Sequence, residues 1–241
     1  TRAHWFKEKF PERYVEVGVA EQNLMAVASG LANYGKIPFA MSYAAFSPGR
    51  NWEQIRSTVA LNDVPVNIVG AHAGVSVGPD GATHQALEDI ATMRVLPNMI
   101  VVVPADSEEA RKATLAIAVN DKPSYIRLAR AKTPIFTTSE TPFEIGVPQI
   151  VYQSEHPKIG IIACGSLVYQ SMLAAEELGK EGIEVSVMNL STIKPMNEKM
   201  ITEFARNLDH IVTAEEHQIH GGMGSAVAEV LVQNTPIKMS F

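Results

Sequence analysis

Short apolar, β-branched runs alternate with segments of helical periodicity along most of the chain. The apolar runs predict buried strands at residues 14–19, 37–43, 64–74, 99–106 and 124–130. Between them, apolar positions recur at helical spacing at residues 21–34, 51–61, 86–95 and 107–119. This alternation is typical of a parallel sheet that is covered by helices on both faces.

The periodic pattern stops between residues 131 and 157, where four prolines interrupt any regular helix. Alternation then resumes, with strands expected at 159–165, 183–190 and 210–216 and helices near 173–178, 198–208 and 225–233. The sequence therefore predicts an α/β protein of two domains, each a mostly parallel twisted sheet flanked by helices. The predicted boundaries are 1–135 for the first domain, 136–157 for a linker and 158–241 for the second domain.

Composition narrows the class of protein. The 241 residues are 46% hydrophobic and carry a net charge of −6 with no acidic or basic block, which argues against nucleic-acid or membrane-surface binding. No signal peptide or membrane-spanning run is visible, and the single cysteine cannot form an internal disulfide, so the cytoplasm is the expected location. The chain starts without methionine and ends where a strand is expected, so we expect both domains to be truncated.

An acidic residue, Glu21, stands where an almost wholly apolar helix begins. Carboxylates are common in first helical turns because the helix dipole stabilises their charge and lowers the pKa. Burial against apolar neighbours would instead raise the pKa of this carboxyl. The sequence alone leaves both possibilities open.

A glycine-rich loop at residues 70–85 follows a predicted strand and contains His72, Asp80 and His84. Ligands of open parallel sheets bind beyond the carboxyl ends of the strands, and glycines let the backbone approach a ligand closely. A flexible connector with solvated polar groups is the alternative. Three protic side chains between glycines favour a ligand site, whereas zinc is disfavoured because a third ligand is lacking.

A second glycine-rich run, at residues 221–230, does not complete a dinucleotide-binding pattern. The third glycine of G-x-G-x-x-G, counted from Gly222, would fall at Val227. The chain also lacks the G-x-x-x-x-G-K-[ST] pattern of a P-loop. We therefore interpret this turn, with the flanking His217 and His220, as mainly structural.

Several motifs together resemble transketolase, a thiamine diphosphate enzyme. They are GVAEQNLMAVASGLA, IPFAMSYAAF, GAHAGVSVGPDGATHQALEDIA, RVLPNMIVVVPAD, YIRLAR and EEHQIHGGMGSAVAE. The match covers nearly the whole chain. The motifs most resemble those of the carboxyl-terminal subunit of transketolases that are encoded as two chains. The resemblance implies a pyrimidine-binding domain followed by the transketolase carboxyl-terminal domain.

The resemblance implies roles around the cofactor. Glu21 holds the place of the glutamate that hydrogen-bonds N1′ of the aminopyrimidine and so helps to activate thiazolium C2. Tyr43 and Phe46 match aromatic residues that stack on the pyrimidine. His84 matches a residue near the reacting edge of the cofactor, where proton transfer is assisted, although some relatives have glutamine there.

The resemblance also implies how substrate is held. Asp80 matches the residue that recognises the α-hydroxyl of the sugar, while His72 and Arg130 match residues that bind the sugar phosphate. The motif that binds Mg2+ and the diphosphate is absent from this sequence, so the resemblance implies an amino-terminal companion subunit that supplies it. Two copies of each chain would then form a heterotetramer around a homodimeric core, acting in the pentose phosphate pathway.

Three alternatives remain open. A 1-deoxyxylulose-5-phosphate synthase shares the Glu-Gln motif but usually has histidine where this chain has Asn23. The β subunit of a 2-oxo acid dehydrogenase shares the architecture and fits the motifs less well. A partner that keeps the fold for assembly alone would not need the candidate site residues.

Overall fold

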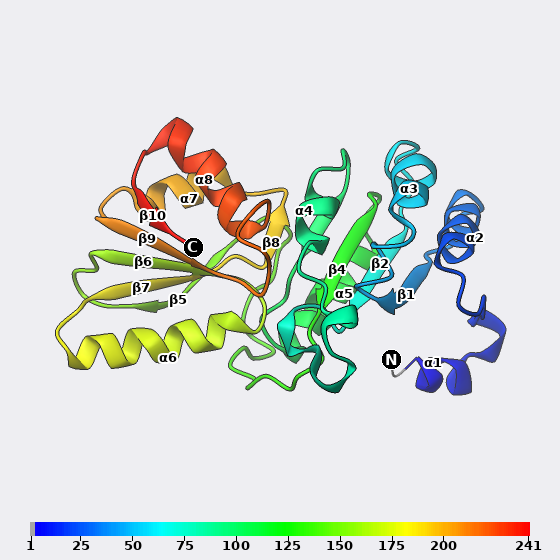
Figure 1. Cartoon of the computed structure of the whole chain (residues 1–241), viewed down its shortest axis with the longest axis horizontal. Helices are drawn as coiled ribbons and strands as arrows, with labels where there is room; N and C mark the ends of the chain where they lie inside the picture. Colours follow the sequence, from blue (N-terminus) through cyan, green and yellow to red (C-terminus); the bar gives the residue numbers. More distant parts are fainter. Residues whose placement is uncertain (1–2) are drawn as a thin grey trace.

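The structure, a computed structural model, describes residues 3–241. Residues 1 and 2, at the start of the predicted first domain, lie outside the described residues. Two five-stranded sheets lie side by side, each mostly parallel and flanked by helices, so the predicted α/β class is confirmed (Figure 1). Across residues 3–241, no helix is both long and apolar enough to cross a membrane.

The first sheet has the strand order β1-β2-β4-β3-β8. Its strands are β1 (Phe39–Tyr43), β2 (Asn67–Ala71), β4 (Ser124–Leu128), β3 (Ile100–Val102) and β8 (Thr192–Lys194). The first four are parallel, and three of them are fully or almost fully buried, which matches their near-continuous apolar sequence. The fifth strand, β8, is antiparallel and comes from the second half of the chain.

Helices and short helical turns precede or connect the first four of these strands. They are α1 (His4–Lys9), η1 (Pro11–Arg13), α2 (Glu21–Asn33), α3 (Trp52–Gln54), η2 (Ile55–Ala60), η3 (Val75–Asp80), η4 (Ala82–His84), α4 (Asp89–Arg94) and α5 (Ser107–Ala118). Helix α5 has the clearest start signal, because the Asp106 carboxylate caps it by accepting the Glu109 N–H at 2.9 Å.

The second sheet has the order β10-β9-β6-β7-β5. Its strands are β10 (Lys238–Ser240), β9 (His210–Ala214), β6 (Ile159–Ala163), β7 (Val185–Asn189) and β5 (Gln149–Gln153). Helix α6 (Leu167–Lys180) lies on one side of this sheet, and α7 (Glu198–Ala205) and α8 (Met223–Asn234) lie on the other (Figure 1). The four strands β10, β9, β6 and β7 are parallel, whereas β5 is antiparallel to β7.

The strand predicted at residues 14–19 is wrong. Val15 and Val19 are exposed, and the Glu16 carboxylate instead accepts hydrogen bonds from the Tyr14 hydroxyl and the Gly18 N–H. No described strand pairs with this segment. Alternating valines form a strand only where a neighbouring strand supplies backbone partners.

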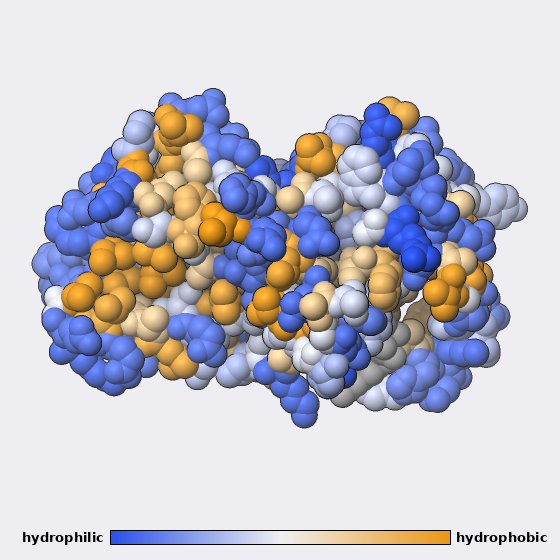
Figure 2. All heavy atoms as spheres, in the orientation of Figure 1, coloured by the Kyte–Doolittle hydropathy of each residue, from blue (hydrophilic) through white to orange (hydrophobic). Residues whose placement is uncertain are grey.

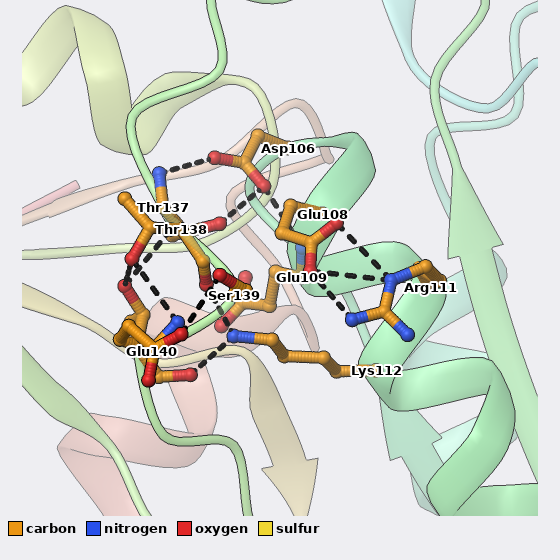
Figure 3. A network of polar contacts seen from close by, with 10 residues as sticks. Asp106, Glu108, Glu109, Arg111, Lys112, Thr137, Thr138, Ser139 and Glu140 are labelled. Atoms are coloured by element: carbon orange, nitrogen blue, oxygen red, sulfur yellow. Dashed lines mark hydrogen bonds and ion pairs between the residues drawn. The ribbon is translucent and has the colours of Figure 1, made fainter.

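The predicted linker also needs correction, because residues 149–153 within it form β5 of the second sheet. Residues 136–141 do lack regular structure, yet they are fixed onto the start of α5 (Figure 3). The Asp106 carboxylate accepts the N–H groups of Phe136 and Thr137 and the Thr137 hydroxyl. Lys112 Nζ donates to the carbonyl oxygens of Thr138 and Thr141.

One hydrophobic core runs through both sheets. Met25, Ile68 and Val101 of the first half belong to the same cluster of buried side chains as Met188 and Val227 of the second. A buried acid adds a polar link, since Glu109 of α5 accepts the Asn189 amide of β7 at 2.9 Å. The two domains are therefore packed together through their interiors.

Hydrophobic residues also reach the surface of the second domain. Figure 2 shows an orange band between α6 and α8 on the face that is viewed in Figure 1. Exposed large side chains of this domain include Leu173, Val232 and Phe241.

Candidate functional site

The candidate site forms where three adjacent parallel strands end. Tyr43 at the end of β1 is in register with Ala71 of β2, which is in register with Leu128 of β4. The three strands therefore deliver the segments that follow them to one edge of the sheet, the edge where ligands of such sheets bind. These segments carry Phe46, the loop from His72 to His84, and Arg130.

Four rings predicted to surround the cofactor and substrate do lie together. The Tyr43 ring packs edge-on against the rings of His72 and His84, with centroids 4.5 and 5.6 Å apart. Phe46 lies 6.2 Å from Tyr43 and 5.2 Å from His84 by the same measure. Edge-to-face contacts of this kind favour particular ring orientations, so the four rings form one aromatic cluster.

Glu21 is buried at the first turn of α2, with 8% of its surface exposed. Its Oε2 atom is buried and has no hydrogen-bond partner in the described structure. Its backbone carbonyl accepts the Asn51 amide at 2.9 Å, and the same amide donates to the Ser47 hydroxyl next to Phe46. Burying an unpartnered carboxylate oxygen is unfavourable, so this atom is a candidate contact point for a ligand.

Asp80 and Arg130 form an ion pair beside the ring cluster. Arg130 Nη1 lies 2.6 Å from Asp80 Oδ2 and also donates to the Val77 carbonyl oxygen at 2.7 Å. Both side chains are about one-third exposed, so the pair lies at the surface of the site. Because both bonds use Nη1, the Nε and Nη2 groups can serve an anion.

His72 has an unusual backbone, with a φ of 57°. Its Nδ1 atom is buried without a hydrogen-bond partner among the described residues. Burial lowers the pKa of the His72 imidazole, and the positive charge of Arg130 lowers it further against the opposing effect of Asp80. A neutral ring can still donate one hydrogen bond to a ligand.

A buried polar network behind the site was not foreseen. Asp89 Oδ2 accepts the Tyr125 hydroxyl and the Arg127 Nε–H, each at 2.7 Å. Burial raises the pKa of Tyr125 well above its ordinary value, and the Asp89 carboxylate adds to this effect. Arg127 Nη2 also donates to the carbonyl oxygens of Ala86 and Glu216, so the network joins the first domain to the second. Tyr125 and Arg127 read as ordinary strand residues in sequence.

In the described part of the chain, no three His, Cys, Asp or Glu side chains lie close enough together to hold a metal ion.

Comparison with models of known protein families identifies the family of this chain. The model of the transketolase pyrimidine-binding domain matches residues 1–135, and that of the transketolase C-terminal domain matches residues 149–240. The chain belongs to the transketolase family.

Individual transketolase relatives agree with this assignment. A Methanocaldococcus jannaschii protein, provisionally named a transketolase C-terminal section, is 43% identical over 97% of this chain and 73% of its own length. The 6-deoxy-6-sulfo-D-fructose transketolase subunit SqwH of Clostridium sp. (strain MSTE9) is 38% identical over 97% of this chain and 72% of its own. This member of the transketolase family is thus related, along almost its whole length, to one protein named a transketolase section and to another named a transketolase subunit.

A solved transketolase structure gives the same result. A split-gene transketolase, described as an inactive β4 tetramer, superposes with a TM-score of 0.90 at 40% identity. The superposition covers 99% of this chain and 78% of that chain. Relationship to split transketolases and to transferases that use thiamine is therefore established, and the two-domain transketolase fold is confirmed.

Proposed function

We propose that this chain is the carboxyl-terminal half of a two-chain transketolase that transfers a two-carbon ketol unit between ketose and aldose sugar phosphates. The observation that carries the proposal is the buried, unpartnered Oε2 atom of Glu21 at the start of an apolar helix. Such an atom suits a ligand group that brings its own proton.

The residues present fit thiamine diphosphate. When bound, this cofactor supplies the electron sink for breaking and forming the bond next to the ketose carbonyl. Glu21 would share a proton with pyrimidine N1′, and the Tyr43 and Phe46 rings would pack against the heterocycle. Apolar surroundings keep water from competing for the Glu21 carboxylate, which strengthens this contact.

The remaining site residues would act on substrate. Asp80 can accept a hydrogen bond from the α-hydroxyl of the sugar, and Arg130 can bind the phosphate through Nε and Nη2. His84 can move a proton at its Nε2, because its Nδ1 is 2.9 Å from the Thr83 hydroxyl. His72 is proposed to add one hydrogen bond to the phosphate.

We propose that Mg2+ and the diphosphate are bound by an amino-terminal companion subunit, in a cytoplasmic heterotetramer with two copies of each chain. The description of a related split transketolase as an inactive β4 tetramer supports a need for the companion. The names of the two relatives, a section and a subunit, support it further.

Mixing experiments test the function. Xylulose 5-phosphate and ribose 5-phosphate should react when the chain is mixed with its companion, thiamine diphosphate and Mg2+, and should not react with the chain alone. Turnover by the isolated chain would contradict the two-chain proposal. Release of CO2 from pyruvate by the mixture would favour the synthase alternative, and faster turnover of a sulfonated ketose would change the substrate class.

Arg130→Ala should raise the KM for phosphorylated substrates by about tenfold to a hundredfold, the range expected for losing a charge-assisted hydrogen bond. Steady-state kinetics of the mixture would measure the change. A ketose without phosphate is the matched control, since it lacks the group that Arg130 binds. An equal rise in KM for both donors would argue against a phosphate contact.

A further inference from the structure

The loop from residue 74 to residue 86 carries Asp80 and His84. Its base is closed by the Gly74 N–H, which donates to the Ala86 carbonyl oxygen at 2.9 Å. The interior is built from two short 3-10 turns, η3 and η4, which offer few backbone hydrogen bonds of their own. The positions of the two side chains therefore depend on what holds this 74–86 loop from outside.

The second domain supplies one such anchor, the carboxylate of Glu216. Its Oε1 accepts the Ser76 N–H at 3.2 Å, and its Oε2 accepts the hydroxyls of Ser76 and Ser166, each at 3.1 Å. Ser166 precedes α6, so the carboxylate bridges the 74–86 loop to the second domain. The backbone of Glu216 is itself fixed by Arg127, which donates to its carbonyl oxygen at 2.7 Å.

The first domain holds the adjacent residue from the other side. Arg130 Nη1 donates to the Val77 carbonyl oxygen while it pairs with Asp80. Ser76 and Val77, which are adjacent in sequence, are thus held by residues of opposite domains. Movement of this part of the loop would require breaking contacts with both domains.

Gly74 shows how closely the carboxylate approaches. A Cβ atom at Gly74 would lie 2.6 Å from Glu216 Oε2, and the φ of this residue is 87°. Both facts favour glycine, which accepts a positive φ and leaves room for the carboxylate. The close fit shows that Glu216 is packed into the loop base and does not merely lie near it.

We infer that Glu216 is a positioning residue, through which the second domain sets the placement of Asp80 and His84 for ketol transfer. The inference rests on the proposed function. Glu216 would act on the reaction only through Ser76 and the loop, so the carboxyl-terminal domain would help to organise the site indirectly. Misplacement of reacting groups by about 1 Å can cost about a hundredfold in rate.

Three variants test this role. Glu216→Ala removes the anchor, whereas Glu216→Gln can keep it, because its amide oxygen can accept the Ser76 N–H and its NH2 group can donate to the two hydroxyls. Glu215→Ala is the matched control. The Glu215 carboxylate accepts only the N–H groups of Met223 and Gly224 at the start of α8, among the described residues, and does not touch the loop.

Two readouts are needed for each variant. Amide hydrogen exchange of residues 75–84 in the full chain should accelerate about tenfold in Glu216→Ala and little in the other two. With the companion subunit, kcat/KM of Glu216→Ala should fall by about tenfold to a hundredfold, and Glu216→Gln should recover most of it.

The outcomes separate this inference from the proposed function. Unchanged exchange in Glu216→Ala, or faster exchange with unchanged kcat/KM, would overturn the positioning role. Equal losses in Glu215→Ala and Glu216→Ala would also overturn it, because they would point to general weakening of the second domain. If the wild-type mixture transfers no ketol unit, the proposed function fails, and the exchange measurement alone then decides whether Glu216 holds the loop.

Discussion

Replacing Glu21 with glutamine should lower ketol transfer by the two-chain enzyme by about a hundredfold to ten-thousandfold. Glutamine has nearly the same shape, so it should still fill the buried position at the start of α2. It cannot take up a proton as a carboxylate does, and the proton shared with pyrimidine N1′ would be lost. The measurement is kcat with saturating thiamine diphosphate, Mg2+ and both sugar phosphates.

Glu53→Gln is the matched control for this experiment. Glu53 lies in α3 and is exposed, so its replacement should change kcat little. Equal activity of Glu21→Gln and Glu53→Gln would contradict the proposed role of Glu21. Inactivity of the wild-type mixture would instead contradict the function itself.

Asp106→Asn should reduce the free energy of unfolding by about 2–4 kcal/mol at neutral pH. The Asp106 carboxylate accepts four hydrogen bonds, which cap α5 and hold residues 136 and 137 (Figure 3). The asparagine side chain has only one oxygen. Because each carboxylate oxygen of Asp106 accepts at least one backbone N–H, the amide NH2 group would face an N–H donor in either orientation. Urea denaturation followed by circular dichroism would measure the loss.

The effect of Asp106→Asn should also depend on pH. Burial pushes the pKa of Asp106 upward, but its hydrogen bonds from Glu109, Thr137 and Phe136 outweigh burial and leave that pKa below its ordinary value. A lowered pKa in the folded state means that the stabilisation is present above the unfolded pKa of about 3.9 and is lost as pH falls through the folded pKa. The stability difference from wild type should therefore narrow in strong acid.

Two outcomes would contradict this role of the Asp106 carboxylate. Glu108→Gln removes a charge from the same helix turn, where Glu108 pairs with the half-exposed Arg111, so it should cost at most about 1 kcal/mol. A loss as large as that of Asp106→Asn would show that general charge at this helix end matters more than the cap. A difference between Asp106→Asn and wild type that stays constant down to strong acid would contradict the pKa argument.

Much of the fold could be predicted because buried parallel strands have near-continuous apolar sequences. Strands β2, β3 and β4 follow this pattern closely. The segment at residues 14–19 misled because alternation of apolar residues does not reveal whether a neighbouring strand exists. Strand β8 was missed because it has only three residues and directly follows another strand, so its sequence carries no period of its own.

The candidate site was predictable to the extent that its residues follow strands. Tyr43, His72 and Arg130 end or follow β1, β2 and β4, so sequence order and sheet topology bring them together. Glu216 could not be found in this way, because its contact with Ser76 spans 140 positions. Asp106 did carry a local signal, since aspartate followed three residues later by glutamate is typical of a helix start.

The position of strand β8 affects how the two domains could be exchanged between related proteins. Thr192–Lys194 complete the sheet of the first domain, although they follow a strand of the second domain directly. A cut in the linker between residues 136 and 148 therefore separates two pieces of sequence without separating two finished sheets. Exchange of second domains between relatives would therefore place a β8 strand from another protein at the edge of the first sheet.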